Sequence, residues 1–516
     1  MEQQSVDTSG RATDAEIGLA SAATANSTRT PQDTLLRYRW MHHFFSEDTS
    51  AENQFVIDLQ RRAVWVGLAL ILQSLNEVPN QPYTHLLGRF SSLIPFALIT
   101  GSFIALWMAM RPQSTREQPE SLAKRPRRWQ RLLLIALLGV SIVGIAEFGI
   151  ATVMCVLPPV FSNDGTSLDT NAAMLLLQGR NPYTDSNMLD IARQFAIQPN
   201  WTTPLREGQF ANRLTYPTMA EFQSVLDTDL KSGIAVEFES KVSYPALSFL
   251  TLLPFALFKD YNVLPFYFGS YLLLIAIAYR VTRPALRPWI LLFGLANIPM
   301  WSSTTGGNLD IFCTLLVVLA WMKREQSWRS SILFGLAMAT KQTSWFLVPF
   351  YAIMVFRQYG FKEAVYRLTV AGGLCLLINL PFILWNPQAW LAGILAPVAD
   401  PMFPLGVGLI NLSNTHLIPY LPDWVYTSLE GGAMLLMLAW YWRICRACPE
   451  AALLLAIIPL FFAWRSLPSY FYCAAYPIFI LMAARRPLPI GQATVVAHIQ
   501  RWLDGLANPV TVQRQS

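Results

Sequence analysis

The sequence predicts an all-α polytopic membrane protein with about 12 transmembrane helices and one large loop, residues 158–243. Of its 516 residues, 53% are hydrophobic and only 14% are charged, whereas about 25% are charged in a typical soluble domain. The apolar residues are concentrated in long runs such as 132–157, 262–279 and 364–385. Each run is close to the ~20 residues that cross ~30 Å of hydrocarbon, and a helix satisfies its own backbone there.

The N-terminal part is expected to comprise a tail, an additional helix pair and a basic loop. Residues 1–55 are rich in Ser, Thr, Ala and Gln and begin without the apolar segment of a cleaved signal peptide. We therefore predict a cytoplasmic, largely disordered tail. Residues 56–110 contain two apolar runs, a transmembrane pair outside the core. Residues 111–131 carry seven Lys/Arg and two Glu, which predicts a cytoplasmic loop because basic residues favour that side.

Residues 132–484 are the predicted transmembrane core, and 485–516 a cytoplasmic tail. Short basic connections in the core are expected on the cytoplasmic side, so both termini are cytoplasmic. These connections are 323–329, 357–367, 443–446 and 485–486. The apolar segments of the whole chain lie at about 63–79, 90–110, 132–157, 244–258, 262–279, 288–302, 309–322, 330–341, 343–356, 364–385, 424–442, 450–464 and 468–484.

The segment 244–258 is expected to dip into the membrane without crossing it. If it crossed, the three arginines within 280–287 would lie outside the cell, against the bias of basic residues. The segment has about 15 residues and contains Pro245 and Pro254, as a partial insertion would. A re-entrant or interfacial helix here leaves 12 spans.

The large loop, residues 158–243, is expected outside the cytoplasm. It holds ten Asp/Glu and six Lys/Arg, and its pattern predicts short helices at about 168–178, 187–197 and 218–231. Asn200-Trp-Thr202 matches a glycosylation acceptor, which has a meaning only in a host that glycosylates it. The loop at 386–423 is expected on the same side.

Two acidic residues near the start of the loop are candidates for chemistry. Asp164 precedes Gly165, and Asp169 follows Leu168. Both have a structural alternative, since Asp-Gly is common in turns and carboxylates favour the first turn of a helix.

Three further candidates lie where membrane segments begin. Tyr244 opens the re-entrant segment, where Pro245 is also a common helix start. Asn308 and Asp310 lie at the outer mouth of an apolar run. A carboxylate within a membrane helix is costly and usually functional, although Asp310 could instead cap the helix at the interface.

The remaining polar candidates are also at outer helix ends. Lys341 and Gln342 lie between two apolar runs, where the lysine either reaches to the interface or binds an anion. Asn414 and His416 belong to a polar cluster in the 386–423 loop, where the histidine is a base, a ligand or neither.

Arg465 and Tyr470 occupy the last outer turn. The arginine is expected on the outer side of the membrane, where basic residues are less common. Bidentate binding of a phosphate would explain an arginine at this position.

Several function classes lose support from the sequence. There is no Walker loop, GxSxG, HExxH or dinucleotide-binding motif, which argues against ATP-dependent transfer and serine hydrolysis. The net charge of +6 comes from short connections and predicts topology, not nucleic-acid binding. The six cysteines avoid the large loop, and Cys445-x-x-Cys448 lacks a second pair, so we expect neither disulfides nor a metal site.

In their order, these motifs resemble the GT-C superfamily of membrane glycosyltransferases, most closely glycosyltransferase family 87. The matching features cover roughly residues 132–484. They are an Asp in the first outer loop, a helix ending in Gly179-Arg180-Asn181-Pro182-Tyr183, Tyr244-Pro245-Ala246, Gly307–Asp310, Ala339-Thr340-Lys341 and Arg465–Tyr470. The second proline of the Tyr-Pro-Pro pattern is replaced by Ala246.

The resemblance implies transfer of a hexose, with mannose favoured, from a polyprenyl-phosphate sugar to a lipid or glycan acceptor outside the cytoplasm. It implies inversion at the anomeric carbon, with an Asp of the first outer loop as base. Asp164 lies 15 residues before Gly179 and Asp169 lies 10 before it. The first spacing fits the family better, and Asp169 stays the alternative. By the same resemblance Arg180 and Tyr183 are candidate substrate contacts.

The alternative function is a secondary transporter or lipid flippase. A transporter should show internal repeats and charges near the middle of the membrane, whereas the polar residues here gather at outer helix ends. We expect no cofactor and no nucleic-acid partner, since the scattered Asp residues provide no ligand cluster for a divalent cation. The expected location is the cell membrane, with the active site outside the cytoplasm.

Overall fold

The computed structural model describes residues 51–77, 87–111, 128–158, 161, 163–195 and 202–485. The predictions for the tails at 1–50 and 486–516, and for most of the basic loop at 111–131, concern residues outside these ranges. Most of the described residues are helical, and apart from two isolated β-bridges their β-structure is limited to two residues in each of two strands.

Four helices in the described part of the chain are long and apolar enough to cross a membrane. They are Gly88–Met110, which joins η1 (Gly88–Ser92) to α5 (Leu93–Met110), α6 (Arg128–Met154), α13 (Leu264–Val281) and α19 (Phe361–Trp385). Large apolar side chains of α6 and α19 are exposed, among them Ile142 and Leu377. Such surfaces fit lipid contact, and the protein is a membrane protein. The prediction of 12 spans is not established.

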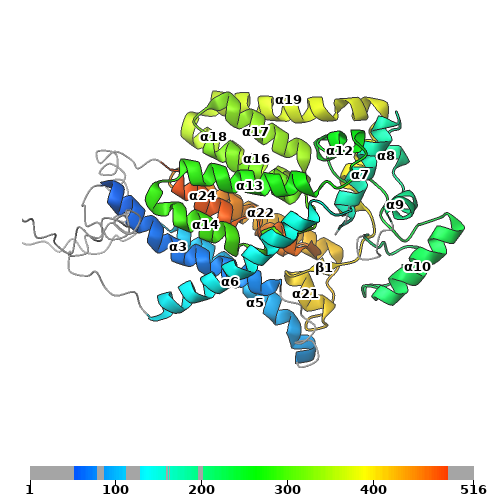
Figure 1. Cartoon of the computed structure of the whole chain (residues 1–516), viewed down its shortest axis with the longest axis horizontal. Coiled ribbons are helices and arrows are strands. Elements are labelled where there is room, and N and C mark those ends of the chain that lie inside the picture. Colours follow the sequence, from blue (N-terminus) through cyan, green and yellow to red (C-terminus); the bar gives the residue numbers. More distant parts are fainter. Residues whose placement is uncertain are drawn as a thin grey trace, which may run out of the picture. The chain divides into compact units, whose positions relative to one another are not determined.

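Other helices complete the helical core. They are α3 (Ala51–Asn76), η4 (Pro284–Leu286), α14 (Arg287–Ala296), α15 (Ile298–Thr305), α16 (Asp310–Met322), α17 (Ser327–Thr340), η5 (Gln342–Leu347), α18 (Val348–Tyr359) and α22 (Asp423–Ile444). Helix α17 packs against α16 and α19, and α19 also packs against α18, so these four helices lie side by side (Figure 1). Helices α3 and α5 contribute to the same main hydrophobic core.

Three segments expected as spans are interrupted in the structure. Segment 288–302 divides at Asn297 into α14 and α15. Segment 450–464 contains η6 (Pro449–Ala451), α23 (Ala452–Leu455) and η7 (Pro459–Phe461), and segment 468–484 contains η8 (Pro468–Tyr470) and α24 (Ala475–Ala483). Each break lies near a proline, which removes a backbone donor and restricts the residue before it.

The large loop folds around a second hydrophobic core. Its helices are α7 (Asp164–Leu177), α8 (Pro182–Asp185), α9 (Met188–Phe195), η3 (Gly208–Phe210) and α10 (Met219–Ser232). Three of them match the expected helices in type and approximate position. Helix α7 starts four residues earlier than predicted because the Asn163 side chain accepts the Thr166 backbone N–H at 2.9 Å and caps it.

The segment after the loop consists of two very short helices, α11 (Leu247–Leu250) and α12 (Leu253–Leu257). Even a continuous helix over this stretch would rise about 16 Å, about half of the ~30 Å core of a bilayer. The segment therefore cannot cross as a helix, and it packs against α7 instead.

The expected outer loop at 386–423 contains two helices that the sequence analysis missed. They are α20 (Pro387–Ala399) and α21 (Leu409–Asn414). Strand β1 (Leu405–Gly406) lies between these two helices in the sequence. It pairs in parallel with β2 (Arg465–Ser466), which follows much later in the chain. This pairing joins two segments that are about 60 residues apart in the sequence and sets the position of Arg465.

Candidate functional site

Asp164 is held at the first turn of α7 by local hydrogen bonds. Its Oδ2 accepts a hydrogen bond from the Thr203 hydroxyl at 2.6 Å, and its Oδ1 accepts from the Gly165 backbone N–H at 2.9 Å. The hydroxyl of Thr166 donates to the carbonyl of Gly307. These bonds connect the start of α7 to the turn before α16, so two polar segments predicted separately from the sequence lie together.

Gly165 leaves room for the ring of Tyr244. A Cβ atom at Gly165 would lie 2.6 Å from Cε2 and 2.9 Å from the hydroxyl oxygen of Tyr244. The backbone of α7 can approach this ring only because residue 165 has no side chain.

We expect Gly165→Ala to displace Tyr244 and to lower the free energy of unfolding by about 1–3 kcal/mol, because overpacking forces side chains from their positions. The matched control is Gly149→Ala on α6, since a Cβ atom there meets nothing within 4 Å. Thermal unfolding of both variants in detergent measures the difference. Equal unfolding temperatures for the two variants would contradict the close contact.

Lys341 and Asp310 form a buried ion pair. Lys341 Nζ lies 2.8 Å from Asp310 Oδ1, and the two side chains are 7% and 6% exposed. The ammonium also lies 5.1 Å from the centroid of the Tyr244 ring, a cation–π distance. Asp310 and Lys341, which were expected at two separate helix ends, therefore form one ion pair.

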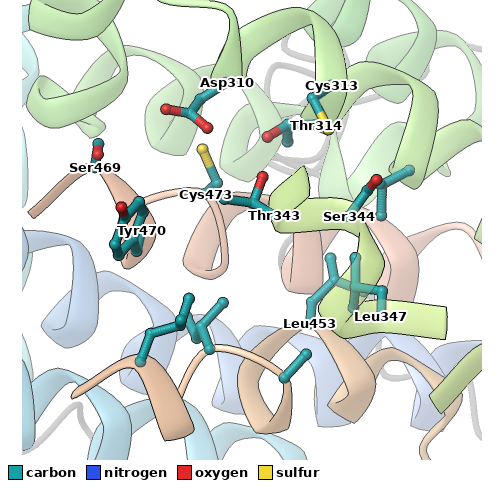
Figure 2. Close-up of a pocket in the computed structure, with 14 residues that line it drawn as sticks. Asp310, Cys313, Thr314, Thr343, Ser344, Leu347, Leu453, Ser469, Tyr470 and Cys473 are labelled. Atoms are coloured by element: carbon teal, nitrogen blue, oxygen red, sulfur yellow. The ribbon is translucent and has the colours of Figure 1, made fainter. Parts of the chain in front are cut away.

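Asp310 also lines a small cavity of about 70 Å³. Asp310 Oδ2 is buried and has no hydrogen-bond partner. Figure 2 shows Asp310, Cys313 and Thr314 from α16 on one side of this cavity and Tyr470 and Cys473 on the other. The ion pair thus lies between this cavity and a larger pocket.

The larger pocket, here called the Asp164 pocket, has a volume of about 370 Å³. Polar groups from six separate parts of the chain reach it: the α7 start, the segment at 243–244, the α16 mouth, the α17–η5 turn, helix α22 and the Arg465 region. Its polar and charged lining residues are Asn163, Asp164, Ser243, Tyr244, Asn308, Lys341, Gln342, Thr343, Glu430, Arg465, Ser469 and Tyr470. Apolar residues of α20 and η5 complete it.

Hydrogen bonds fix several of these lining groups. The Gln342 side chain donates to the carbonyl of Ser243 and, at 3.2 Å, to that of Ile394. The Asn308 side chain donates to the Tyr472 hydroxyl at 3.3 Å. The Arg465 guanidinium contacts the sulfur of Met402 and forms no ion pair with a carboxylate in the described part of the chain. Arg465 is therefore an unneutralised cation at the pocket.

Asp169, the alternative candidate base, lies behind the pocket and does not line it. The side chain is buried, and its Oδ1 accepts a hydrogen bond from the Ser248 hydroxyl at 2.8 Å. Burial raises the pKa of the Asp169 carboxyl to about 8, although the Ser248 hydrogen bond and the nearby Lys341 lower it. At neutral pH this group is largely protonated.

A raised carboxyl pKa makes stability depend on pH. Between about pH 4 and pH 8 the folded protein holds a proton that the unfolded chain releases, so stability decreases as pH rises through this window and levels off above it. The slope is at most about 1.4 kcal/mol per pH unit. We expect Asp169→Asn, which resembles the neutral acid, to lose the part of this slope that Asp169 contributes in thermal unfolding from pH 5 to 9. Asp190→Asn, an exposed control, should keep it; identical slopes in wild type and Asp169→Asn would contradict the shift.

Besides Asp169 and Asp310, four predicted site residues do not line the Asp164 pocket. Arg180 is paired with Asp185 at 3.0 Å on the surface. Tyr183 is buried, and its hydroxyl donates to the carbonyl of Tyr244 at 2.8 Å, so it supports a pocket residue from behind. The side chains of Asn414 and His416 are exposed, and Asn414 donates to a backbone carbonyl of the same loop.

The comparisons with known proteins identify the domain that holds most of this pocket. Residues 243–468 match the model described as glycosyltransferase family 87. This part of the chain is a glycosyltransferase family 87 domain. No curated protein and no solved structure matches the chain. The matched residues of the family 87 domain include Tyr244, Asp310, Lys341 and Arg465, whereas Asp164 precedes them. The family indicates a glycosyltransferase.

One acidic pocket residue of the family 87 domain was missed by sequence reasoning. Glu430 lies within the apolar segment 424–442 and lines the Asp164 pocket. The sequence signal for Glu430 was a lone carboxylate in an apolar segment, the same kind of signal by which Asp310 was selected.

The described ranges contain no group of three His, Cys, Asp or Glu side chains that could hold a metal ion. The expectation of no cofactor stays a prediction.

Proposed function

We propose that this chain transfers a hexose, mannose being favoured, from a polyprenyl-phosphate sugar to a lipid or glycan acceptor outside the cytoplasm, with inversion. The observation that carries the proposal is the Asp164 pocket, which combines a carboxylate, an unneutralised arginine and an apolar wall. This combination suits a sugar phosphate whose lipid remains in the membrane. The family 87 domain supports the same class of reaction.

Asp164 is proposed as the base. A single displacement requires one group to take the proton of the acceptor hydroxyl as this oxygen attacks the anomeric carbon. Asp164 borders the pocket and receives hydrogen bonds from Thr203 and from a backbone N–H. These donors orient the carboxylate.

Arg465 is proposed to bind the leaving phosphate. The bond from the anomeric carbon to the phosphate oxygen breaks as the acceptor bond forms, and the oxygen keeps the electron pair. A guanidinium matches this oxygen geometry and stabilises the charge that develops. Lys341 is already paired with Asp310, so its contribution to the same phosphate is smaller and Arg465 carries the main part.

The apolar wall of the pocket is proposed to receive the lipid of the donor. Ile394, Leu395, Pro397 and Val398 of α20 line it. Val398 is 71% exposed and Leu395 is 42% exposed, so this wall continues onto an apolar outer surface. A polyprenyl chain could leave the pocket there and enter the bilayer without passing through water.

The test is sugar transfer by the purified protein in lipid nanodiscs. Polyprenyl-phosphate mannose labelled in the sugar serves as donor, a lipid and glycan extract of the source membrane as acceptor, and a nucleotide-linked mannose as control donor. We expect transfer from the polyprenyl-phosphate donor alone and a product of inverted configuration. Absence of transfer from both polyprenyl-phosphate mannose and polyprenyl-phosphate glucose, or a retained configuration, would overturn the proposal. Movement of the lipid between leaflets without transfer would favour the flippase.

A further inference from the structure

Glu430 stands apart from the other charged groups of helix α22. The less exposed residues of this helix include Tyr426, Glu430, Met434, Met437 and Tyr441, at spacings of three and four residues, which is one helical stripe. Leu435 and Leu436 on the other side are 70% and 67% exposed, as lipid-facing residues would be. Glu430 is the one charged residue on the protein-facing stripe between the two buried tyrosines.

The carboxyl of Glu430 has no partner within the described ranges. It takes part in no hydrogen bond or ion pair there, and it lies seven residues after the start of α22, about 10 Å along the helix. A carboxylate at such a place is costly and is usually retained for a function. Because Glu430 lines the Asp164 pocket, a molecule in that pocket would supply the missing donors.

The residues on the other side of the pocket limit which chemical groups of a bound molecule can lie next to Glu430. Helix α22 packs against η7, and the chain from Leu460 to Arg465 continues along the pocket. The cation Arg465 would hold the phosphate, and Asp164 the reacting hydroxyl. An anionic side chain accepts hydrogen bonds and repels a phosphate. Among the groups of a sugar phosphate, those that suit a place next to Glu430 are therefore the hydroxyls of the sugar ring, which are neutral hydrogen-bond donors.

We propose that Glu430 binds the hydroxyl groups of a sugar ring in the Asp164 pocket and helps to select that sugar. The proposal rests on the glycosyltransferase function proposed above and adds a residue that determines specificity. The ring belongs to the donor or to the acceptor, and the chemistry of recognition is the same for both. Glu430 transfers no proton in this role.

The test compares Glu430→Gln and Glu430→Ala with wild type in the transfer assay, titrating polyprenyl-phosphate mannose and the acceptor extract separately. A hydrogen bond to a charged group contributes about 1.5–3 kcal/mol, which is about 10- to 150-fold in binding. We expect Glu430→Ala to raise the half-saturating amount of one substrate by this factor with kcat within about threefold. Glu430→Gln, which keeps an acceptor oxygen, should show a smaller rise.

The substrate whose half-saturating amount rises identifies the source of the ring. Asp423→Asn, an exposed carboxylate at the start of the same helix, should leave both values unchanged. If both Glu430 variants had wild-type half-saturating amounts for both substrates, the inference would be overturned and the proposed function would stand. A fall in kcat together with a lower unfolding temperature would indicate a structural role and would also overturn it. A wild-type protein that transfers no sugar overturns both proposals.

Discussion

Asp164→Asn is expected to lower kcat for sugar transfer by about 100- to 10,000-fold, the usual contribution of a general base. The asparagine still accepts a hydrogen bond from Thr203, which lies 2.6 Å from Asp164 Oδ2, but it cannot take the proton of the acceptor. The cations Arg465 and Lys341, which are proposed to bind the phosphate, are unchanged. Half-saturation by the polyprenyl-phosphate donor should therefore move by less than about threefold.

The matched control is Asp227→Asn, which removes a carboxylate on the exposed face of α10 whose hydrogen-bond partner within the described ranges is Gln223. Thermal unfolding should show that both variants remain folded. Full activity of Asp164→Asn would remove Asp164 from the mechanism. If Asp169→Asn instead abolished transfer with unchanged stability, the base would be Asp169, and the buried carboxyl would have to reach the pocket during the reaction.

Lys341→Met is expected to produce the largest loss of stability of any single substitution considered. It leaves the Asp310 carboxylate, 6% exposed, without its counter-charge, and breaking a buried pair in this way costs about 3–5 kcal/mol. The double variant Lys341→Met, Asp310→Leu removes both charges and should recover most of this loss. Thermal unfolding in detergent measures both effects.

The control pair for this experiment is Arg193 with Asp190, which are 3.3 Å apart and about half exposed. Arg193→Met should change stability by no more than about 0.5 kcal/mol, because water screens exposed pairs. The double variant also separates folding from activity. A stable double variant with full transfer would show that Lys341 has no part in the chemistry, whereas a stable but slow one would support a contribution to phosphate binding.

The membrane class and most helices of the large loop could be predicted from short-range patterns. Apolar runs near 20 residues must become helices in lipid, and α6, α13 and α19 follow this rule. Polar residues before apolar periodic segments mark helix starts, as at Thr218, whose side chain and that of Glu221 form a reciprocal cap of α10. Both rules depend only on neighbouring residues.

The segments after residue 386 were predicted less well because apolar composition alone does not distinguish a span from short packed pieces. Helix α20 was expected as a loop, and residues 450–464 and 468–484 were expected as unbroken spans. Buried backbone in these pieces is satisfied by contacts with other parts of the protein. One example is the carbonyl of Phe471, which accepts a hydrogen bond from the Gln73 side chain at 3.2 Å, 398 residues away.

By itself the sequence determined that this protein lies in a membrane, that acidic residues and isolated cations occur near helix ends, and that their order resembles glycosyltransferase family 87. Only the tertiary structure decided which of them meet. It placed Asp164, Lys341 and Arg465 around one pocket and Asp169 behind it, and it added Glu430. The reason is that spacing along the chain determines neighbours within one helix, whereas the pocket is built from segments that meet only when the helices pack.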